Sequence, residues 1–319
     1  MLLRNRADWR SLVWVAGMAS IASFQLATHA IPLLLPLTCY LALSAGVMAH
    51  NHNHCPTFRS RTLNNYFGYS LSVFYGYPTF AWIPTHNLNH HKFLNRPGDA
   101  TITWRYSNKN STWIAATYFF VSSYFQSDVI KAYIRGARKD NPRQFRLIVS
   151  QYVVWAGAHV LLLGIACARF GVWRGIGAWA LIFGVPAFFA LWTIMLFNFV
   201  QHVHTDPWSE HNHSRTFVGK TLNFFLFNNG FHTAHHETPG AHWTTLPALH
   251  SQIEAEIDPA LRTKSFAWWC FRNYLLGCFS DLWRTHQIGR APFDPPSRLE
   301  RLRDPAEMLV VGRAKAAQG

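Results

Sequence analysis

The sequence predicts an all-α integral membrane protein. It should have four transmembrane helices in two hairpins, interfacial helices, and a cytoplasmic helical cap that carries clusters of histidine. Hydrophobic residues make up 50% of the 319 residues and charged residues only 14%. The charges avoid long apolar windows, and about 20 apolar residues suffice for a helix to cross a bilayer. Aromatic residues reach 16%, which is typical of the aromatic belts at membrane interfaces.

The four spans are expected at residues 11–28, 31–49, 147–168 and 175–200. Residues 11–49 contain no Asp, Glu, Lys or Arg, so they are too long for a signal peptide and long enough for two crossings. Pro186 is expected to kink the fourth span, which membrane helices tolerate. We expect residues 1–290 to form a single domain and residues 291–319 a flexible tail.

Three further segments are expected outside the spans. Residues 64–84 are aromatic and broken by glycine and proline, and residues 111–130 are apolar but rich in Ser and Tyr, so both should lie at the interface. Residues 131–146 form a basic anchor on the cytoplasmic side. Residues 251–286 have the pattern of an amphipathic helix with an aromatic patch.

The basic residues predict the orientation. The net charge is +14, yet of the 29 Lys and Arg only Arg169 and Arg174 fall in the expected outer loops. Since cytoplasmic loops carry the positive excess, both termini and the histidine clusters should face the cytoplasm, at the plasma membrane in a bacterium. No basic stripe stands apart from the spans, which argues against nucleic-acid binding. The five cysteines lack a CxxC pair and are interpreted as free thiols.

Histidines gather in three clusters at the ends of apolar runs. The clusters are His50 and His54, then His86, His90 and His91, then His232, His235 and His236. On a helix, spacings of three and four residues place side chains on one face. His52 lies two residues from both members of its cluster and should point away. His159 lies deep in the third span, where a neutral histidine bonded to a neighbouring helix explains it as well as a functional role.

Histidines with no carboxylate among them suit zinc, copper or iron. A structural zinc needs only four ligands, so the excess of donors favours two ions with open positions and oxygen chemistry at non-haem iron. Five side chains near the clusters are candidates for holding the imidazole N–H groups by hydrogen bonds. They are Asp99, His204, Asp206, Glu237 and His242.

The order of the three clusters, HxxxH, HxxxHH and HxxHH, resembles the membrane fatty acid desaturase superfamily. The resemblance runs from about Leu34 to Leu249. It includes the local strings His54-Cys-Pro-Thr-Phe58 and Asn198-Phe-Val-Gln-His202. It implies four transmembrane helices under a cytosolic cap, with a histidine-bound di-iron centre between them.

The resemblance also implies a ligand set. Its members are His50, His54, His86, His90, His91, His202, His232, His235, His236 and, through a metal-bound water, Asn198. The implied first iron has His50, His91, His202, His232 and His236. The implied second iron has His54, His86, His90, His235 and the Asn198 water.

The implied function is that of a membrane-bound, O2-dependent di-iron fatty acyl desaturase. The substrate would be a fatty acyl lipid, acyl-CoA or acyl-ACP, held in a tunnel with Phe74, Tyr77 and Trp82 as candidate lining residues. No haem, flavin or dinucleotide motif is visible, so electrons should come from a separate ferredoxin- or cytochrome-like protein with its reductase.

Two other hypotheses remain open. The same centre could hydroxylate or ketolate an alkyl chain, a lipid or a carotenoid. A non-catalytic membrane metal-binding or transport protein belongs to a different class, but it predicts ligands along the spans rather than at their cytoplasmic ends.

Overall fold

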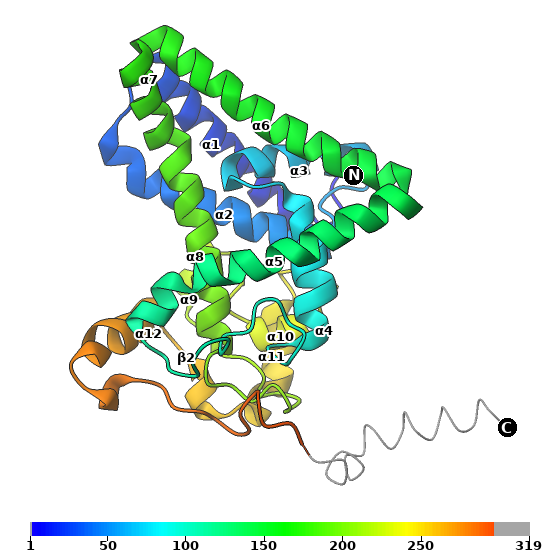
Figure 1. Cartoon of the computed structure of the whole chain (residues 1–319), viewed down its shortest axis with the longest axis vertical. Coiled ribbons are helices and arrows are strands. Elements are labelled where there is room, and N and C mark those ends of the chain that lie inside the picture. Colours follow the sequence, from blue (N-terminus) through cyan, green and yellow to red (C-terminus); the bar gives the residue numbers. More distant parts are fainter. Residues whose placement is uncertain (1, 297–319) are drawn as a thin grey trace, which may run out of the picture.

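The computed structural model describes residues 2–296, so most of the tail expected at 291–319 lies outside the described residues. Figure 1 shows long helices in one half of the molecule and short helices gathered at the ends of two of them. The long helices are α1 (Trp9–Ala27), α2 (Leu35–His54), α3 (Arg61–Tyr75), α5 (Thr112–Asp140), α6 (Pro142–Phe170) and α8 (Val185–His202), which the shorter α7 (Val172–Trp179) precedes in one helical segment. The short ones are α4 (His91–Phe93), α9 (Lys220–Phe225), α10 (His232–Glu237), α11 (Leu246–Ile253) and α12 (Phe266–Cys270).

Three helical segments in the described part of the chain are long and apolar enough to cross a membrane. They are Pro32–His54, Pro142–Phe170 and Val172–His202. The first expected span, residues 11–28, falls on α1. This helix also contains Arg10 and Gln25, and it is not among these three segments. The expected count of four spans is thus supported for three of them.

The third of these segments is not a uniform α-helix. Between α7 and α8 the backbone forms a π-helical turn at Ala180–Gly184, and Pro186 follows in the first turn of α8. A proline has no N–H to donate, and a wider turn before it avoids the clash of its ring with the preceding carbonyl. The irregularity therefore falls where the sequence predicted a kink.

Helices α2 and α8 form the centre of the core. In α2 every residue from Leu41 to His50 is buried, and small residues such as Ala45 and Ala49 allow neighbouring helices to approach closely. In α8 the residues from Phe199 to His202 are buried in the same way. Since α2 ends at His54 and α8 at His202, the packing of these two helices brings two sets of histidines to one level.

Two expected segments differ from the structure. The segment 111–130 and the basic segment after it are not separate, because α5 continues through both to Asp140, where Asn141 and Pro142 begin α6. The amphipathic helix expected over 251–286 is wrong. Asp258 and Pro259 turn the chain, and the strand β2 (Arg262–Thr263) pairs in parallel with β1 (Thr216–Phe217) before the short helix α12.

Gly76 ends α3 in a left-handed conformation, with φ of +88°. An added Cβ would lie 2.4 Å from Cβ of Ala187 on α8. Glycine is therefore required at this position both by the left-handed backbone conformation and by the close approach of α3 to α8.

We expect Gly76→Ala to lower the stability by about 1–3 kcal/mol, because both the backbone conformation and the contact with α8 become strained. Thermal unfolding in detergent measures the effect. Gly17→Ala in α1 is the matched control, since nothing lies within 4 Å of its added Cβ. Equal melting temperatures for the two variants would contradict this account of the α3–α8 contact.

Candidate metal centre

The nine candidate histidines come from five elements and meet at one place. The last turn of α2 carries His50 and His54, and the last residue of α8 is His202. The helix α10 carries His232, His235 and His236. The π-helical turn Ile83–His90 carries His86 and His90, and α4, which follows at once, begins with His91.

The π-helical turn explains how His86 and His91 meet. In an α-helix residues five positions apart lie on different faces, whereas the i→i+5 hydrogen bonds of a π-helix bring them close to the same side. His91 Nε2 accordingly lies 3.1 Å from His86 Nε2.

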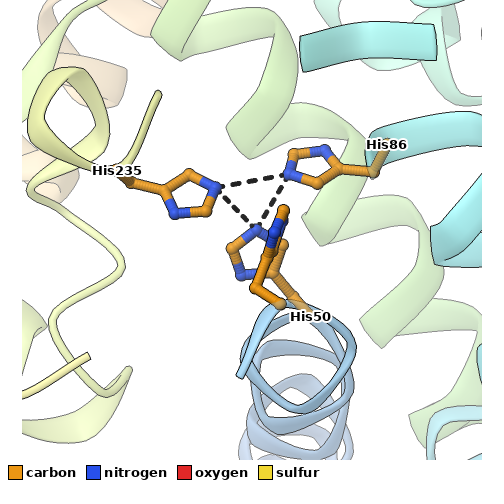
Figure 2. Close-up of side chains that lie close together, drawn as sticks. His50, His86 and His235 are labelled. Carbon is orange, nitrogen blue, oxygen red and sulfur yellow. Dashed lines mark hydrogen bonds between the residues drawn. The ribbon is translucent and has the colours of Figure 1, made fainter. Parts of the chain in front are cut away.

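The first cluster consists of His50, His54, His86 and His235, whose candidate ligand atoms all lie within 4.8 Å of one another. Figure 2 shows three of the rings pointing their Nε2 atoms at a common point. His50 Nε2 lies 2.9 Å from His86 Nε2 and 3.1 Å from His235 Nε2. His91 Nε2 joins this group, at 3.1 Å from His235 Nε2.

The second cluster consists of His90, His202, His232 and His236, again with ligand atoms within 4.8 Å of one another. His202 Nε2 lies 3.1 Å from His90 Nε2 and 2.9 Å from His232 Nε2. His236 Nε2 lies 3.0 Å from His232 Nε2.

This grouping corrects the division of ligands between two metals that the resemblance implied. His50 was expected with His202 and lies instead with His86 and His235. His91 lies between the clusters: its Nε2 is 3.1 Å from Nε2 of both His86 and His235, and its ring centroid is 4.4 Å from that of His236. His90 was expected with the first of these clusters and lies in the second, against His202. The other six histidines fall with the partners expected for them.

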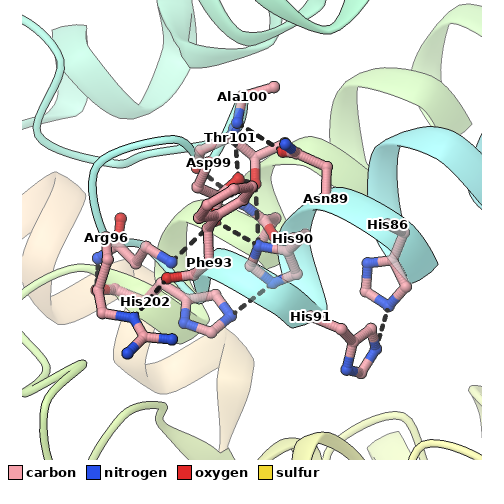
Figure 3. Close-up of polar contacts among 12 residues, drawn as sticks. His86, Asn89, His90, His91, Phe93, Arg96, Asp99, Ala100, Thr101 and His202 are labelled. Atoms are coloured by element: carbon pink, nitrogen blue, oxygen red, sulfur yellow. Dashed lines mark hydrogen bonds and ion pairs between the residues drawn. The ribbon is translucent and has the colours of Figure 1, made fainter. Parts of the chain in front are cut away.

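Hydrogen bonds at the far nitrogens fix the tautomers of three rings. His50 Nδ1 lies 3.0 Å from Asn51 Oδ1, and His202 Nδ1 lies 3.2 Å from the carbonyl oxygen of His213. His90 Nδ1 lies 2.8 Å from Asp99 Oδ2 (Figure 3). Each acceptor is an oxygen without a proton, so each Nδ1 donates, and Nε2 of the neutral ring presents a bare lone pair.

The geometry therefore fits metal cations. His90 and His202 turn two bare lone pairs toward each other at 3.1 Å, which is repulsive unless a cation lies between the rings and their neighbours. His54 Nε2 is buried with no hydrogen-bond partner among the described residues. The donors are all imidazole nitrogens, which suit zinc, copper or iron, and two clusters suit two ions.

Burial favours the neutral rings that metals need. Desolvation first, and then the neighbouring imidazoles, hold the pKa of His86, His232 and His235 well below the usual value. A neutral imidazole binds metal without first losing a proton, so these rings are ready to coordinate at neutral pH.

Asp99 is the carboxylate that holds a cluster histidine. Burial alone would raise its pKa, but the hydrogen bonds from His90 and Thr101 hold the pKa of Asp99 below its usual value. The backbone N–H of Asn95 also donates to Asp99 Oδ2, at 2.8 Å. Asp99 therefore stays ionised and fixes the proton of His90 on Nδ1.

The other four candidates for this role do not touch the clustered imidazoles. Asp206 accepts from the backbone N–H groups of Trp208 and Arg290, and so closes turns. Glu237 accepts from His211, and His242 bonds Asp8. His204 bonds Thr285 and the carbonyl of Asn108. These expectations were wrong, because nearness in sequence to a cluster did not fix the direction of the side chain.

The two histidines left out as ligands are accounted for by other contacts. His52 Nδ1 bonds Thr57, and its ring packs against Phe67, away from the clusters. His159 Nε2 donates to the carbonyl of Val73, which links α6 to α3.

Sequence reasoning missed three partners of the clusters, of which Asn51 beside His50 is one. Thr101 Oγ1 lies 3.0 Å from His90 Nδ1, and the carbonyl of His213 accepts from His202. The Thr101 contact follows from the turn after Asp99, whereas a backbone carbonyl has no signature in the sequence.

A cavity of about 500 Å³ adjoins both clusters. His50 and His86 of the first cluster and His90 and His232 of the second lie on its wall. Tyr77 and Trp82 line it as expected, whereas Phe74 does not and packs instead in the core with Ala22 and Phe183. Asn198 also lines the cavity, and its Nδ2 donates to the hydroxyl of Tyr118 at 2.7 Å.

The apolar helices and the two buried imidazole clusters define a membrane protein with a histidine-lined metal centre. A family model described as fatty acid desaturase matches residues 24–268, and the chain belongs to this family of membrane desaturases and hydroxylases, which are oxidoreductases. No curated protein matches the chain.

Asp99→Asn should lower the affinity of the second cluster for metal by about 10–100-fold, because the amide holds the His90 tautomer less firmly. Metal content of the purified protein, measured during titration with a chelator, tests this. Asp128→Asn is the control, since its exposed side chain pairs only with Lys131 on the same helix. Equal metal retention in the two variants would refute a positioning role for Asp99.

Proposed function

We propose that the protein is an O2-dependent di-iron desaturase that introduces a double bond into a fatty acyl chain. The observation that carries the proposal is the apolar cavity that adjoins both histidine clusters. Family membership supports the choice of iron as the metal and of an oxidative reaction. When bound, two irons supply the activation of O2 and the removal of hydrogen from an unactivated carbon.

The cavity walls suit an extended alkyl chain. On α5 the lining residues recur every three or four positions from Phe119 to Ile134, a face about 22 Å long. Leu191, Ile194 and Phe197 of α8 also line the cavity. The apolar side chains of this wall can hold a chain by apolar contact and keep water away from the reacting carbon, although the α5 face also carries Ser123, Gln126, Ser127 and Lys131.

Individual residues at the inner part of the cavity have distinct tasks. The ring of Trp82 packs edge-on against the rings of both His50 and His86, which fixes these two ligands beside the cavity. Asp99 keeps the His90 proton on Nδ1, so that Nε2 remains a ligand. Asn198, one helical turn before His202, is the residue proposed to hold a metal-bound water.

The proposal extends to orientation and partners. Both termini and the metal centre would face the cytoplasm, where a separate ferredoxin- or cytochrome-like protein delivers two electrons. The acyl chain would be carried by a lipid, by CoA or by an acyl carrier protein. All nine candidate ligands lie at helix ends or in the cap rather than along the spans, which favours an enzyme over a transport pathway.

Lipid profiling of cells that express the protein should show new double bonds, and these should be absent with His235→Ala. The purified wild-type protein should contain two irons per chain, one for each cluster. His29→Ala, at an exposed position, should leave both results unchanged. New hydroxyl or keto groups in place of double bonds would show that the reaction is hydroxylation or ketolation and not desaturation. One zinc per chain would contradict the di-iron proposal.

Ser127→Phe should reduce product formation at least tenfold while the iron content stays at the wild-type level, because the added ring occupies the cavity and not the clusters. Asp128→Phe is the matched control, since the neighbouring side chain is exposed and outside the cavity. Product analysis and iron analysis of the same preparations test this. Unchanged activity of Ser127→Phe would show that the acyl chain binds elsewhere.

A further inference from the structure

A second cavity, of about 430 Å³, lies in the cap and is lined by none of the clustered histidines. Residues of β2, α12 and the chain before Ile288 form its wall. Five of the lining side chains are cationic, and no carboxylate lines it: Arg215, Arg262, Lys264, Arg272 and Arg284. Such a concentration of one charge in a concave site is typical of a site for an anion.

The nearby carboxylates that the structure describes pair with only two of these five cations. Glu254 lies 3.4 Å from Arg262 and Asp281 lies 2.6 Å from Arg284, and both acidic side chains are exposed. Among the described residues, no carboxylate lies within ion-pair distance of Lys264, Arg272 or the buried Arg215. The cavity therefore carries a positive excess.

Arg215 is a buried residue of the cavity wall, and its hydrogen bonds connect this wall to the end of α8. It is 1% exposed, and its Nη1 donates to the carbonyls of Val200 and Val203, at the end of the α8 span. Its guanidinium lies over the ring of Trp269, 4.9 Å from the centroid. The cavity thus lies at the level where α8 leaves the apolar region.

Hydrogen-bonding capacity in the cavity wall is left unused. The buried Nε atoms of Arg215, Arg262, Arg272 and Arg284 have no partner among the described residues. A buried donor without an acceptor is costly, and a phosphate group offers several charged oxygens that match guanidinium geometry.

An exposed apolar surface adjoins the same cavity. Trp268 is 56% exposed, Phe279 83% and Leu282 90%, and Phe271 and Leu275 between them are also exposed. Figure 1 shows α12 and the chain after it beside the first turns of α5, and Thr112 at the start of α5 donates to the carbonyl of Tyr274. Trp113 on α5, which is 76% exposed, continues this apolar surface.

We infer that residues 262–284 form a site for an anionic phospholipid of the cytoplasmic leaflet. The headgroup phosphate occupies the arginine-lined cavity, and the apolar side chains from Trp268 to Leu282 enter the lipid beside it. A basic cluster next to exposed aromatic and aliphatic side chains, at the end of a span, matches both parts of such a lipid. The lipid would hold the cap against the membrane surface, and this role does not depend on the reaction at the histidine clusters.

The test uses the full chain in nanodiscs of equal parts phosphatidylcholine and phosphatidylglycerol that carry a trace of photoactivatable phosphatidylglycerol. Cross-links should map to residues 262–284. Arg272→Gln should lower their yield about fivefold, as expected for one basic residue at a membrane surface, and Arg272→Lys should restore most of it. Arg143→Gln, exposed and distant from the cavity lining, should change nothing.

A second pair of variants tests the apolar part. Leu282→Ser should lower the cross-link yield, whereas Leu33→Ser, equally exposed at another turn, should not. Equal cross-link yields from Arg272→Gln and Arg143→Gln would overturn the proposal. So would a photoactivatable phosphatidylcholine that labels residues 262–284 as strongly as the phosphatidylglycerol probe. Displacement of the lipid by inorganic phosphate would show that the cavity takes a free anion instead. Displacement by an acidic protein would make it a protein-docking site.

Discussion

Mutual repulsion among buried lone pairs is the constraint on which this structure depends. Nine imidazoles from five elements turn their ring nitrogens toward two points, and hydrogen bonds at Nδ1 of His50, His90 and His202 leave their Nε2 atoms without protons. In the low dielectric of the interior such an arrangement is costly, unless cations occupy both points. The binding energy of two metals would then be part of the folding energy of the protein, because no preformed site exists in the unfolded chain.

The architecture serves this convergence. The buried α2 and α8 end at one level and so present His50, His54 and His202 from the membrane half of the molecule. The short α10, the π-helical turn Ile83–His90 and α4 after it supply the rest. A cavity that adjoins both clusters links them to the apolar interior, which is where we propose that an acyl chain binds.

The sequence predicted eight of the nine clustered histidines from their spacing, because regular spacing at the ends of apolar runs is a local property. The ninth, His202, was expected only from the family resemblance. The sequence did not predict which histidine lies against which, because that depends on a π-helical turn, and such turns have no reliable signature in sequence. The sequence predicted Asp99 as a partner of a cluster histidine, and Asp99 bonds His90. The other candidates Asp206, Glu237 and His242 bond other residues. Phe74 failed as a lining residue for the same reason, since an aromatic side chain packs equally well in the core. Tertiary pairing of β2 with β1 overrode the helical pattern expected over 251–286.

Anomalous X-ray scattering at the iron edge, from crystals of the protein as isolated, tests the central claim most directly. We predict two peaks, one among Nε2 atoms of His50, His54, His86, His91 and His235 and the other among those of His90, His202, His232 and His236. A single peak, or no iron within reach of either set of rings, would contradict the claim that paired cations hold these imidazoles together.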